Sequence, residues 1–303
     1  MKAVHRGTSL FQLCRLFGVT RQAYYQHFWY YEESNFEADL VLQEVKNIRR
    51  LNPIIGCRKL NVMLQPFLLD HQIKMGRDAL FDLMATHKLL VRKRKCKIQT
   101  TYSRHWLKKY PNLIIDVVPS RVNEIWVADI TYFKIKKGNV YISFITDAYS
   151  KKIVGYYVAE TLEAINSIRA LQMALEQNNI SGEKLIHHSD RGVQYCCADY
   201  VKLLQDNQIM ISMTESGDPL DNAIAERING IIKEEYLKHY SFNNRKEVEK
   251  KLNEAVYQYN KYRPHLSCNM LTPSDVHQNN LPTHRLWKNY YKQKPNFVNV
   301  SQD

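Results

Sequence analysis

The chain has 303 residues, of which 45% are hydrophobic, so it can bury a sizeable core and is not an intrinsically disordered protein. Its 43 Lys and Arg outnumber 30 Asp and Glu, which gives a formal net charge of +13. This excess of positive charge favours an acidic polymer as the partner, and nucleic acid is the first candidate.

The N-terminal residues do not form a signal peptide, because His5, Arg6 and Gln12 interrupt the apolar residues that follow Lys2. No stretch of the sequence is long and apolar enough to span a membrane. The six cysteines include no CxxC pair and are typical of reduced thiols. We therefore expect a cytoplasmic protein without a membrane partner.

Residues 9–28 have the pattern of two short helices. Apolar residues recur at helical spacing from Leu10 to Phe17, Gly18 ends the first helix, and Thr20 can cap the second. This is the spacing of a helix-turn-helix motif, whose second helix can enter the major groove of DNA. Because the motif is short, an ordinary helical hairpin is an equally good interpretation.

A separate helix is expected at 37–51, followed by a helical pair around 58–64 and 77–84. Arg58 and Arg77 stand near the beginnings of that pair, where they would suit contacts with the DNA backbone.

A basic segment follows, with no acidic residue and nine Lys or Arg between Leu83 and Ile115. Each cation that displaces a phosphate counterion adds salt-sensitive affinity for DNA. We expect this segment to follow a DNA backbone, although a flexible hinge would have the same composition. Four consecutive residues are the expected contacts: Arg92, Lys93, Arg94 and Lys95.

The pattern then changes to an alternation of period two, which predicts β-strands. We expect strands at 126–135, 140–147, 153–158, 185–190 and 209–213, and helices at 163–178, 198–206, 218–233 and 243–262. Three antiparallel strands followed by alternating helices and strands predict an α/β fold, a ribonuclease-H-like mixed sheet flanked by helices. An all-α helix-turn-helix region precedes this sheet and a helical C-terminal segment follows it.

These patterns divide the chain into five parts. They are a partial helix-turn-helix at 1–36, a helical DNA-binding domain at 37–95, a basic linker at 96–121, the α/β core at 122–240, and a helical segment with a basic tail at 241–303.

Three carboxylates in the α/β core are candidates for a catalytic site. Asp129 is expected inside the first strand, Asp190 at the end of the fourth, and Glu226 on a helix face with Asn222 and Asn229. Taken singly, each has an ordinary explanation: an ion pair inside a sheet, a turn, or a solvated polar face. The first and fourth strands should be neighbours, and the later helix could lay Glu226 across them.

Three converging carboxylates repel one another unless a cation lies between them. Hard oxygen ligands with room for water and phosphate suit Mg²⁺ or Mn²⁺. Two such ions about 4 Å apart stabilise the attacking and leaving oxygens of a phosphoryl displacement. We therefore expect two metal ions per site.

The blocks around these acids resemble the signature of bacterial insertion-sequence transposases of the DDE superfamily, which have a retroviral-integrase-like catalytic core. The matching blocks are 126–132, 187–195 and 221–227, with 35 residues between Asp190 and Glu226 and a basic residue, Lys233, seven positions after Glu226. The chain resembles the second, catalytic frame of the branch with two overlapping reading frames. Residues 37–95 and 262–265 also resemble segments of that family.

This resemblance implies DNA cleavage at the element ends, and then transfer of the freed 3′-hydroxyl to another phosphodiester without a covalent enzyme intermediate. In this branch the route commonly runs through a circular copied intermediate. Asp129, Asp190 and Glu226 would be the catalytic residues and the metal ligands. Lys233, Arg191, Asn222 and Asn229 would contact DNA, and Asn222 could also support the metal shell. We expect His188 to pack the loop or orient Asp190 rather than to bind metal.

The resemblance also implies the partners. They are double-stranded DNA, as terminal inverted repeats and as target, further copies of this chain, and the product of an upstream frame or a fusion with it. The protein would be associated with the nucleoid when bound to DNA. The zinc module of retroviral integrases is missing, so no structural zinc is expected. Two other interpretations stay open: a metal-dependent nuclease of the same fold, or a non-catalytic DNA-binding remnant of a transposase.

Overall fold

The structure is a computed structural model that describes residues 9–91, 106–115, 117–178, 184–215 and 222–283. For residues 27–35 it describes the backbone alone. The chain forms two compact units, which are considered one at a time. The helical unit consists of Met1–Leu51 and Gly56–Val91, and the core unit of Asn52–Ile55 and Arg92–Asp303.

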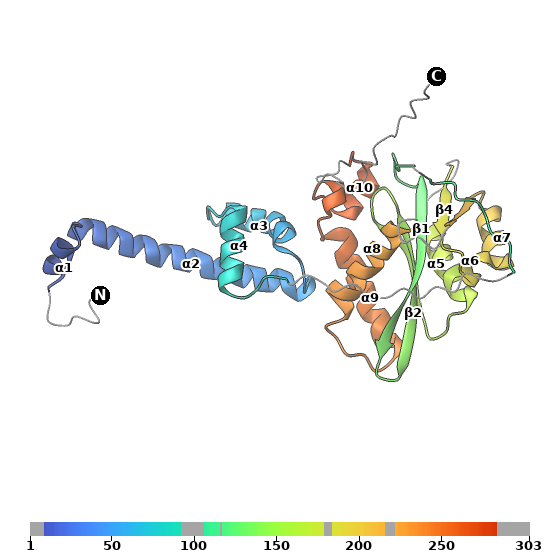
Figure 1. Cartoon of the computed structure of the whole chain (residues 1–303), viewed down its shortest axis with the longest axis horizontal. Coiled ribbons are helices and arrows are strands. Elements are labelled where there is room, and N and C mark those ends of the chain that lie inside the picture. Colours follow the sequence, from blue (N-terminus) through green and yellow to red (C-terminus); the bar gives the residue numbers. More distant parts are fainter. Residues whose placement is uncertain (1–8, 92–105, 116, 179–183, 216–221, 284–303) are drawn as a thin grey trace, which may run out of the picture. The chain divides into compact units, whose positions relative to one another are not determined.

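The helical unit contains α1 (Leu10–Leu16), α2 (Arg21–Leu51), α3 (Cys57–Asp70) and α4 (Arg77–Thr86), drawn in blue to cyan in Figure 1. A capping box starts α1, in which the side chains of Ser9 and Gln12 bond each other's backbone N–H groups. Thr20 accepts a hydrogen bond from the Ala23 N–H over 3.0 Å, so the expected cap of the next helix is confirmed.

The expectation of separate helices at about 20–28 and 37–51 is wrong. One helix of 31 residues, α2, covers both segments, and the expected boundary at residue 36 lies inside it. The physical reason is that no Gly or Pro occurs between Arg21 and Leu51, so nothing in the sequence ends the helix early. The helices expected around 58–64 and 77–84 are confirmed as α3 and α4.

The core unit is built on a five-stranded sheet with the order β3-β2-β1-β4-β5. Its strands are β1 (Ile125–Ile135), β2 (Gly138–Asp147), β3 (Ile153–Ala159), β4 (Ile186–Ser189) and β5 (Met210–Met213). β1, β2 and β3 pair antiparallel, whereas β4 runs parallel to both β1 and β5. All five strands were expected, and the ribonuclease-H-like order is confirmed.

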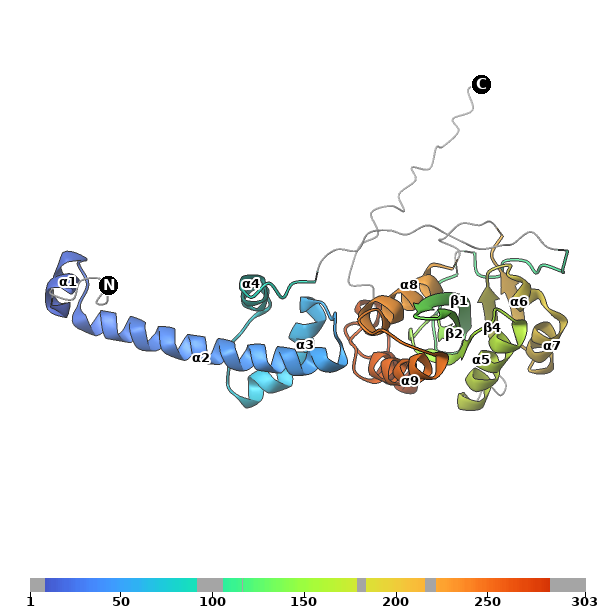
Figure 2. The ribbon, with the colours of Figure 1, turned by 90° about the horizontal axis from the view of Figure 1, so that it is seen from below.

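Helices cover both faces of this sheet, as Figure 2 shows. One face packs on α5 (Ala164–Gln177), α6 (Val193–Cys196) and α7 (Ala198–Asp206), around Trp126 and Ile145. The other packs on α8 (Ala223–Ile231), a π-helical turn at Ile232–Leu237 and α9 (Arg245–Lys261), around Ile142 and Phe144. A short 3₁₀ turn, Leu266–Cys268, and α10 (Pro273–Asn279) complete the described chain.

The sequence did not predict α6, α10 or the π-helical turn. The first residues of the helix expected at 218–233 lie outside the described residues, and within them α8 begins after Asn222. In the described part of the chain no helix is both long and apolar enough to cross a membrane.

Candidate active site

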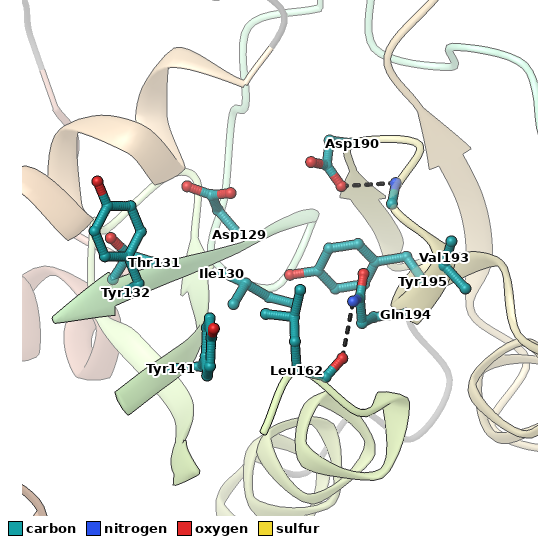
Figure 3. Close-up of a pocket in the computed structure, with 11 residues that line it drawn as sticks. Asp129, Ile130, Thr131, Tyr132, Tyr141, Leu162, Asp190, Val193, Gln194 and Tyr195 are labelled. Atoms are coloured by element: carbon teal, nitrogen blue, oxygen red, sulfur yellow. Dashed lines mark hydrogen bonds between the residues drawn. The ribbon is translucent and has the colours of Figure 1, made fainter. Parts of the chain in front are cut away.

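Two of the predicted acids are brought together by neighbouring parallel strands. Val127 of β1 lies opposite His188 of β4, so the same register carried two residues further places Asp129 beside Asp190. Asp190 directly follows β4, at the carboxyl edge of the parallel strands, where open sheets bind ligands. Figure 3 shows both carboxylates on the same side of the cleft.

The two carboxylates line one cavity of about 440 Å³. Its remaining wall combines apolar, aromatic and amide side chains from β1, β2, α6 and nearby loops: Ile130, Thr131, Tyr132, Tyr141, Leu162, Gly192, Val193, Gln194 and Tyr195. The cavity is large enough for a segment of substrate beside the acids.

The third predicted acid lies near this pair but is not joined to it. Glu226 stands on an exposed face of α8 and is not among the residues that line the cavity. The Asp190 charge nevertheless helps to raise the pKa of Glu226, after burial, and Glu226 helps to raise that of Asp129. Among the described residues, no three His, Cys, Asp or Glu side chains come close enough together to hold a metal ion.

Asp129 has a strongly raised pKa. Burial, and then the charges of Asp190 and Glu226, raise its pKa to about 7, against hydrogen bonds from Asn229 and the Ile130 N–H, which lower it. None of the groups that shift this pKa is a cation. Asp129 therefore lacks a cation that lowers its pKa.

Asn222 and Asn229 on the polar face of α8 contact β1, whereas Glu226 on the same face is exposed. The Asn222 amide donates to the Ala128 carbonyl over 2.9 Å, and the Asn229 amide donates to Asp129 Oδ2 over 2.8 Å. Lys233 Nζ, in the π-helical turn, donates to Thr131 Oγ1 over 3.0 Å. These three bonds hold the helix that carries Glu226 against the strand that carries Asp129.

Asn222 and Asn229 were expected to contact DNA. Both are buried, and their amides donate hydrogen bonds to β1. Their contact with DNA stays a prediction. The sequence placed them on the face of Glu226, but periodicity could not show that this face meets a strand.

A tight turn holds Asp190. The Gly192 N–H donates to Asp190 Oδ1 over 3.0 Å, and a Cβ atom at position 192 would lie 2.9 Å from that same oxygen. His188 is buried, with Nδ1 2.8 Å from Ser212 Oγ, as expected for a residue that packs the loop. Gly192 belongs to one of the blocks that resemble the transposase signature, and the turn considered for Asp190 from the sequence is present here.

The other expected DNA contacts belong to both units of the chain. Arg191 directly follows Asp190 and is half-buried. In the helical unit Arg58 is exposed near the start of α3, and Arg77 is exposed and paired with Asp78 over 2.8 Å. Arg92, Lys93, Arg94 and Lys95 lie outside the described residues.

The donor atoms at the site fit a divalent cation. Ionised carboxylates are hard oxygen ligands that can only accept hydrogen bonds. The buried Oδ1 atoms of Asn222 and Asn229 also have no hydrogen-bond partner among the described residues. Asp129 and Asp190 would bind the ion from the cavity, and Glu226 would join them by a movement of its exposed side chain.

Comparison with known families agrees with this arrangement. Two models, both described as an integrase core domain, match residues 119–219 and 207–273. Together they extend over β1 to β5, the three acids and α8 to α9.

Similar proteins come from bacterial insertion elements. The chain is 34% identical over 266 residues to an uncharacterized 31 kDa protein of insertion element IS600 from Shigella sonnei, covering 86% of this chain and 96% of that protein. It is 36% identical over 182 residues to the transposase of IS629 from Shigella sonnei, covering 60% and 61%. It is 32% identical over 183 residues to transposase InsF of IS3A from Escherichia coli, covering 60% and 63%.

Solved structures with some likeness include the catalytic core domain of HTLV-2 integrase in complex with magnesium. It is 21% identical with a TM-score of 0.42, covering 51% of this chain and 96% of that one. A simian T-cell lymphotropic virus intasome has 18% identity and a TM-score of 0.45, covering 78% and 76%. The extent of the IS600 match and the integrase core models settle the family: the chain belongs to the bacterial insertion-sequence DDE transposases with an integrase core, enzymes that cleave DNA and transfer its strands.

Proposed function

We propose that Asp129, Asp190 and Glu226 are the catalytic carboxylates of this transposase and that they bind two divalent ions, Mg²⁺ or Mn²⁺. The observation that carries the proposal is the cavity shared by Asp129 and Asp190, with Glu226 within electrostatic range and no cation among the groups that shift the pKa of Asp129. When bound, the metal would supply Lewis-acid stabilisation to the attacking and leaving oxygens of a phosphodiester.

The surrounding residues position these acids. Asn229 holds one oxygen of Asp129, and Asn222 fixes the beginning of α8 to β1. The Gly192 N–H orients Asp190 by a hydrogen bond that only a residue without a side chain permits at this distance. Preorganised ligands of this kind lower the cost of gathering negative charge before the substrate arrives.

The DNA would approach across the cavity and over basic residues of both units. Lys233 is held between Thr131 and the ring of Tyr132, 4.8 Å from its centroid, and would contact the terminal base pairs of the element. Arg191, Arg58 and Arg77, with the run Arg92 to Lys95, would contact phosphates. The partners we propose are terminal inverted repeats, target DNA, further copies of this chain and the upstream-frame product, at the nucleoid.

A strand-transfer assay with Mg²⁺ and the inverted repeats that flank the gene tests this function. The wild-type chain should cleave the element end and join its 3′-hydroxyl to a target, and Asp190→Asn should lose both activities. Asp199→Asn is the matched control, because Asp199 is an exposed acid in the first turn of α7. Ca²⁺ should support DNA binding without turnover.

Each other outcome points to a different function. Cutting without joining would identify a nuclease, and binding without cutting would identify a non-catalytic remnant. Robust cleavage in EDTA would overturn the role of the metal ions.

A further inference from the structure

Two neighbouring tyrosines of the core unit differ in the hydrogen bonding of their hydroxyl groups. Tyr195 of α6 and Tyr200 of α7 are both fully buried, and their rings meet edge to face with centroids 5.4 Å apart. Both rings also approach His187, at 6.3 and 5.5 Å. The two tyrosines therefore form one aromatic cluster with His187 of β4.

The difference lies in their hydroxyl groups. The Tyr200 hydroxyl lies 2.9 Å from His187 Nε2 and forms a hydrogen bond there. The buried Tyr195 hydroxyl has no hydrogen-bond partner among the described residues. Leaving such a group unpaired costs about 1–3 kcal/mol, and buried polar atoms in folded proteins are nearly always paired.

The location of Tyr195 indicates which group could accept a hydrogen bond from its hydroxyl. Tyr195 lines the cavity of Asp129 and Asp190, and Figure 3 shows its hydroxyl pointing into that cavity toward β1. Both carboxylate charges help to raise the pKa of Tyr195, after burial and Tyr200, so the hydroxyl lies within their electrostatic range and stays protonated. A protonated phenol can donate a hydrogen bond, whereas ionised carboxylates can only accept.

We propose that the Tyr195 hydroxyl donates a hydrogen bond to an oxygen atom bound at Asp129 and Asp190, either a water on the metal ion or a phosphodiester oxygen of the DNA. This role rests on the proposed function, because it assumes that the carboxylates hold a divalent ion. Tyr195 thus completes the site with a donor that none of the three acids can supply. It also explains why a buried phenol within electrostatic range of two carboxylates bonds to neither.

The test compares Tyr195→Phe with Tyr200→Phe in the full chain, because each substitution removes one buried hydroxyl from the same aromatic cluster. Without metal, Tyr195→Phe should leave the melting temperature unchanged or raise it, since it removes an unpaired group. Tyr200→Phe should lower the melting temperature, since it breaks the bond with His187. If Tyr195→Phe is instead the more destabilising variant without metal, its hydroxyl has a structural partner and the proposal is overturned.

Metal binding is then measured by calorimetry with Mn²⁺ alone. Tyr195→Phe should bind Mn²⁺ about tenfold more weakly if its partner is a metal-bound water, as loss of an outer-shell hydrogen bond commonly does. Tyr200→Phe should bind as tightly as the wild-type chain. A second arm measures affinity for an inverted-repeat duplex in Ca²⁺, and a loss confined to that arm identifies a phosphate oxygen as the partner.

Two failures can be told apart. If Tyr195→Phe binds both Mn²⁺ and the inverted-repeat duplex as tightly as the wild-type chain does, the proposed hydrogen bond is refuted while the proposed function stands. If the wild-type chain itself binds Mn²⁺ no better than Asp190→Asn does, the metal site fails and the inference fails with it.

Discussion

Two carboxylates of the core unit, Glu235 and Asp129, are balanced in opposite ways. Glu235, in the π-helical turn, receives two hydrogen bonds from Arg263, with Nε 2.8 Å from Oε2 and Nη2 2.9 Å from Oε1. Both side chains are almost wholly inaccessible to solvent. The Glu235 charge and its hydrogen bonds raise the pKa of Arg263 despite its burial, so the Arg263 guanidinium stays charged.

No cation is among the groups that shift the pKa of Asp129. Its pKa is raised by burial and by two other acids, and lowered only by neutral hydrogen-bond donors. The comparison teaches that the chain supplies a cation where a carboxylate is structural and omits one where a carboxylate is proposed to act. An ion that binds from solution can arrive with the substrate, whereas a fixed Arg would occupy its place.

Removing the internal cation should produce the largest effect. Arg263→Met leaves the Glu235 carboxylate buried and unpaired, which should lower the free energy of unfolding by about 3–5 kcal/mol. Urea denaturation measures the loss. The double variant Arg263→Met with Glu235→Gln removes both charges and should recover much of it. If the double variant is no more stable than the single one, charge balance is not what Arg263 provides.

Removing the Asp129 carboxylate should instead stabilise the metal-free chain. Asp129→Asn should raise the stability of the metal-free chain at pH 8 by about 2 kcal/mol, because it removes an acid whose pKa is elevated by folding. The unfolded chain loses this proton near pH 4 and the folded chain near pH 7, so wild-type stability from this group falls across that interval.

Denaturation of wild type and Asp129→Asn from pH 4 to pH 8 isolates this contribution. The two should be equally stable near pH 4 and diverge toward pH 8. His187, whose pKa is lowered to about 3 by burial, destabilises both chains below pH 6.5 and cancels in the difference. Parallel stability curves would mean that Asp129 is already balanced in the free protein.

Displacing Asp190 should weaken metal binding by about 10–100-fold, the usual effect of losing support for a ligand. Gly192→Ala does this, because the new Cβ would press on Asp190 Oδ1 while the backbone at this position, with φ −65°, accepts alanine. Mn²⁺ calorimetry measures the change. Gly56→Ala is the control, since a Cβ there meets nothing within 4 Å. Equal Mn²⁺ affinities of the two variants would show that the turn at Gly192 does not support the metal site.

Competition between protons and metal gives the smallest expected effect. Since Asp129 must lose its proton to bind an ion, Mg²⁺ affinity should fall by up to about tenfold per pH unit below pH 7. The Mg²⁺-induced rise in melting temperature should therefore be larger at pH 8 than at pH 6. A rise that does not depend on pH would show that the cation binds elsewhere.

Much of the core unit could be predicted from the sequence because its cues are local. Alternation of period two located β1 and β2, and the change to helical spacing located α5 and α8. Predictions from the sequence failed where the local sequence carries no signal for the structure that forms. Because the segment contains no Gly or Pro, α2 continues past the point where a helix was expected to end. The π-helical turn has no sequence signature of its own.

The sequence by itself determined which residue types are available: two aspartates at strand positions, a glutamate on a helix face, and a strongly basic chain around them. Only the tertiary structure decided their surroundings. The parallel register of β1 and β4 placed Asp129 beside Asp190, and the packing of α8 turned Asn229 onto Asp129 while Glu226 stayed exposed. The reason is physical, because desolvation and charge repulsion depend on distances between residues that are remote in the chain, and no local pattern encodes those distances.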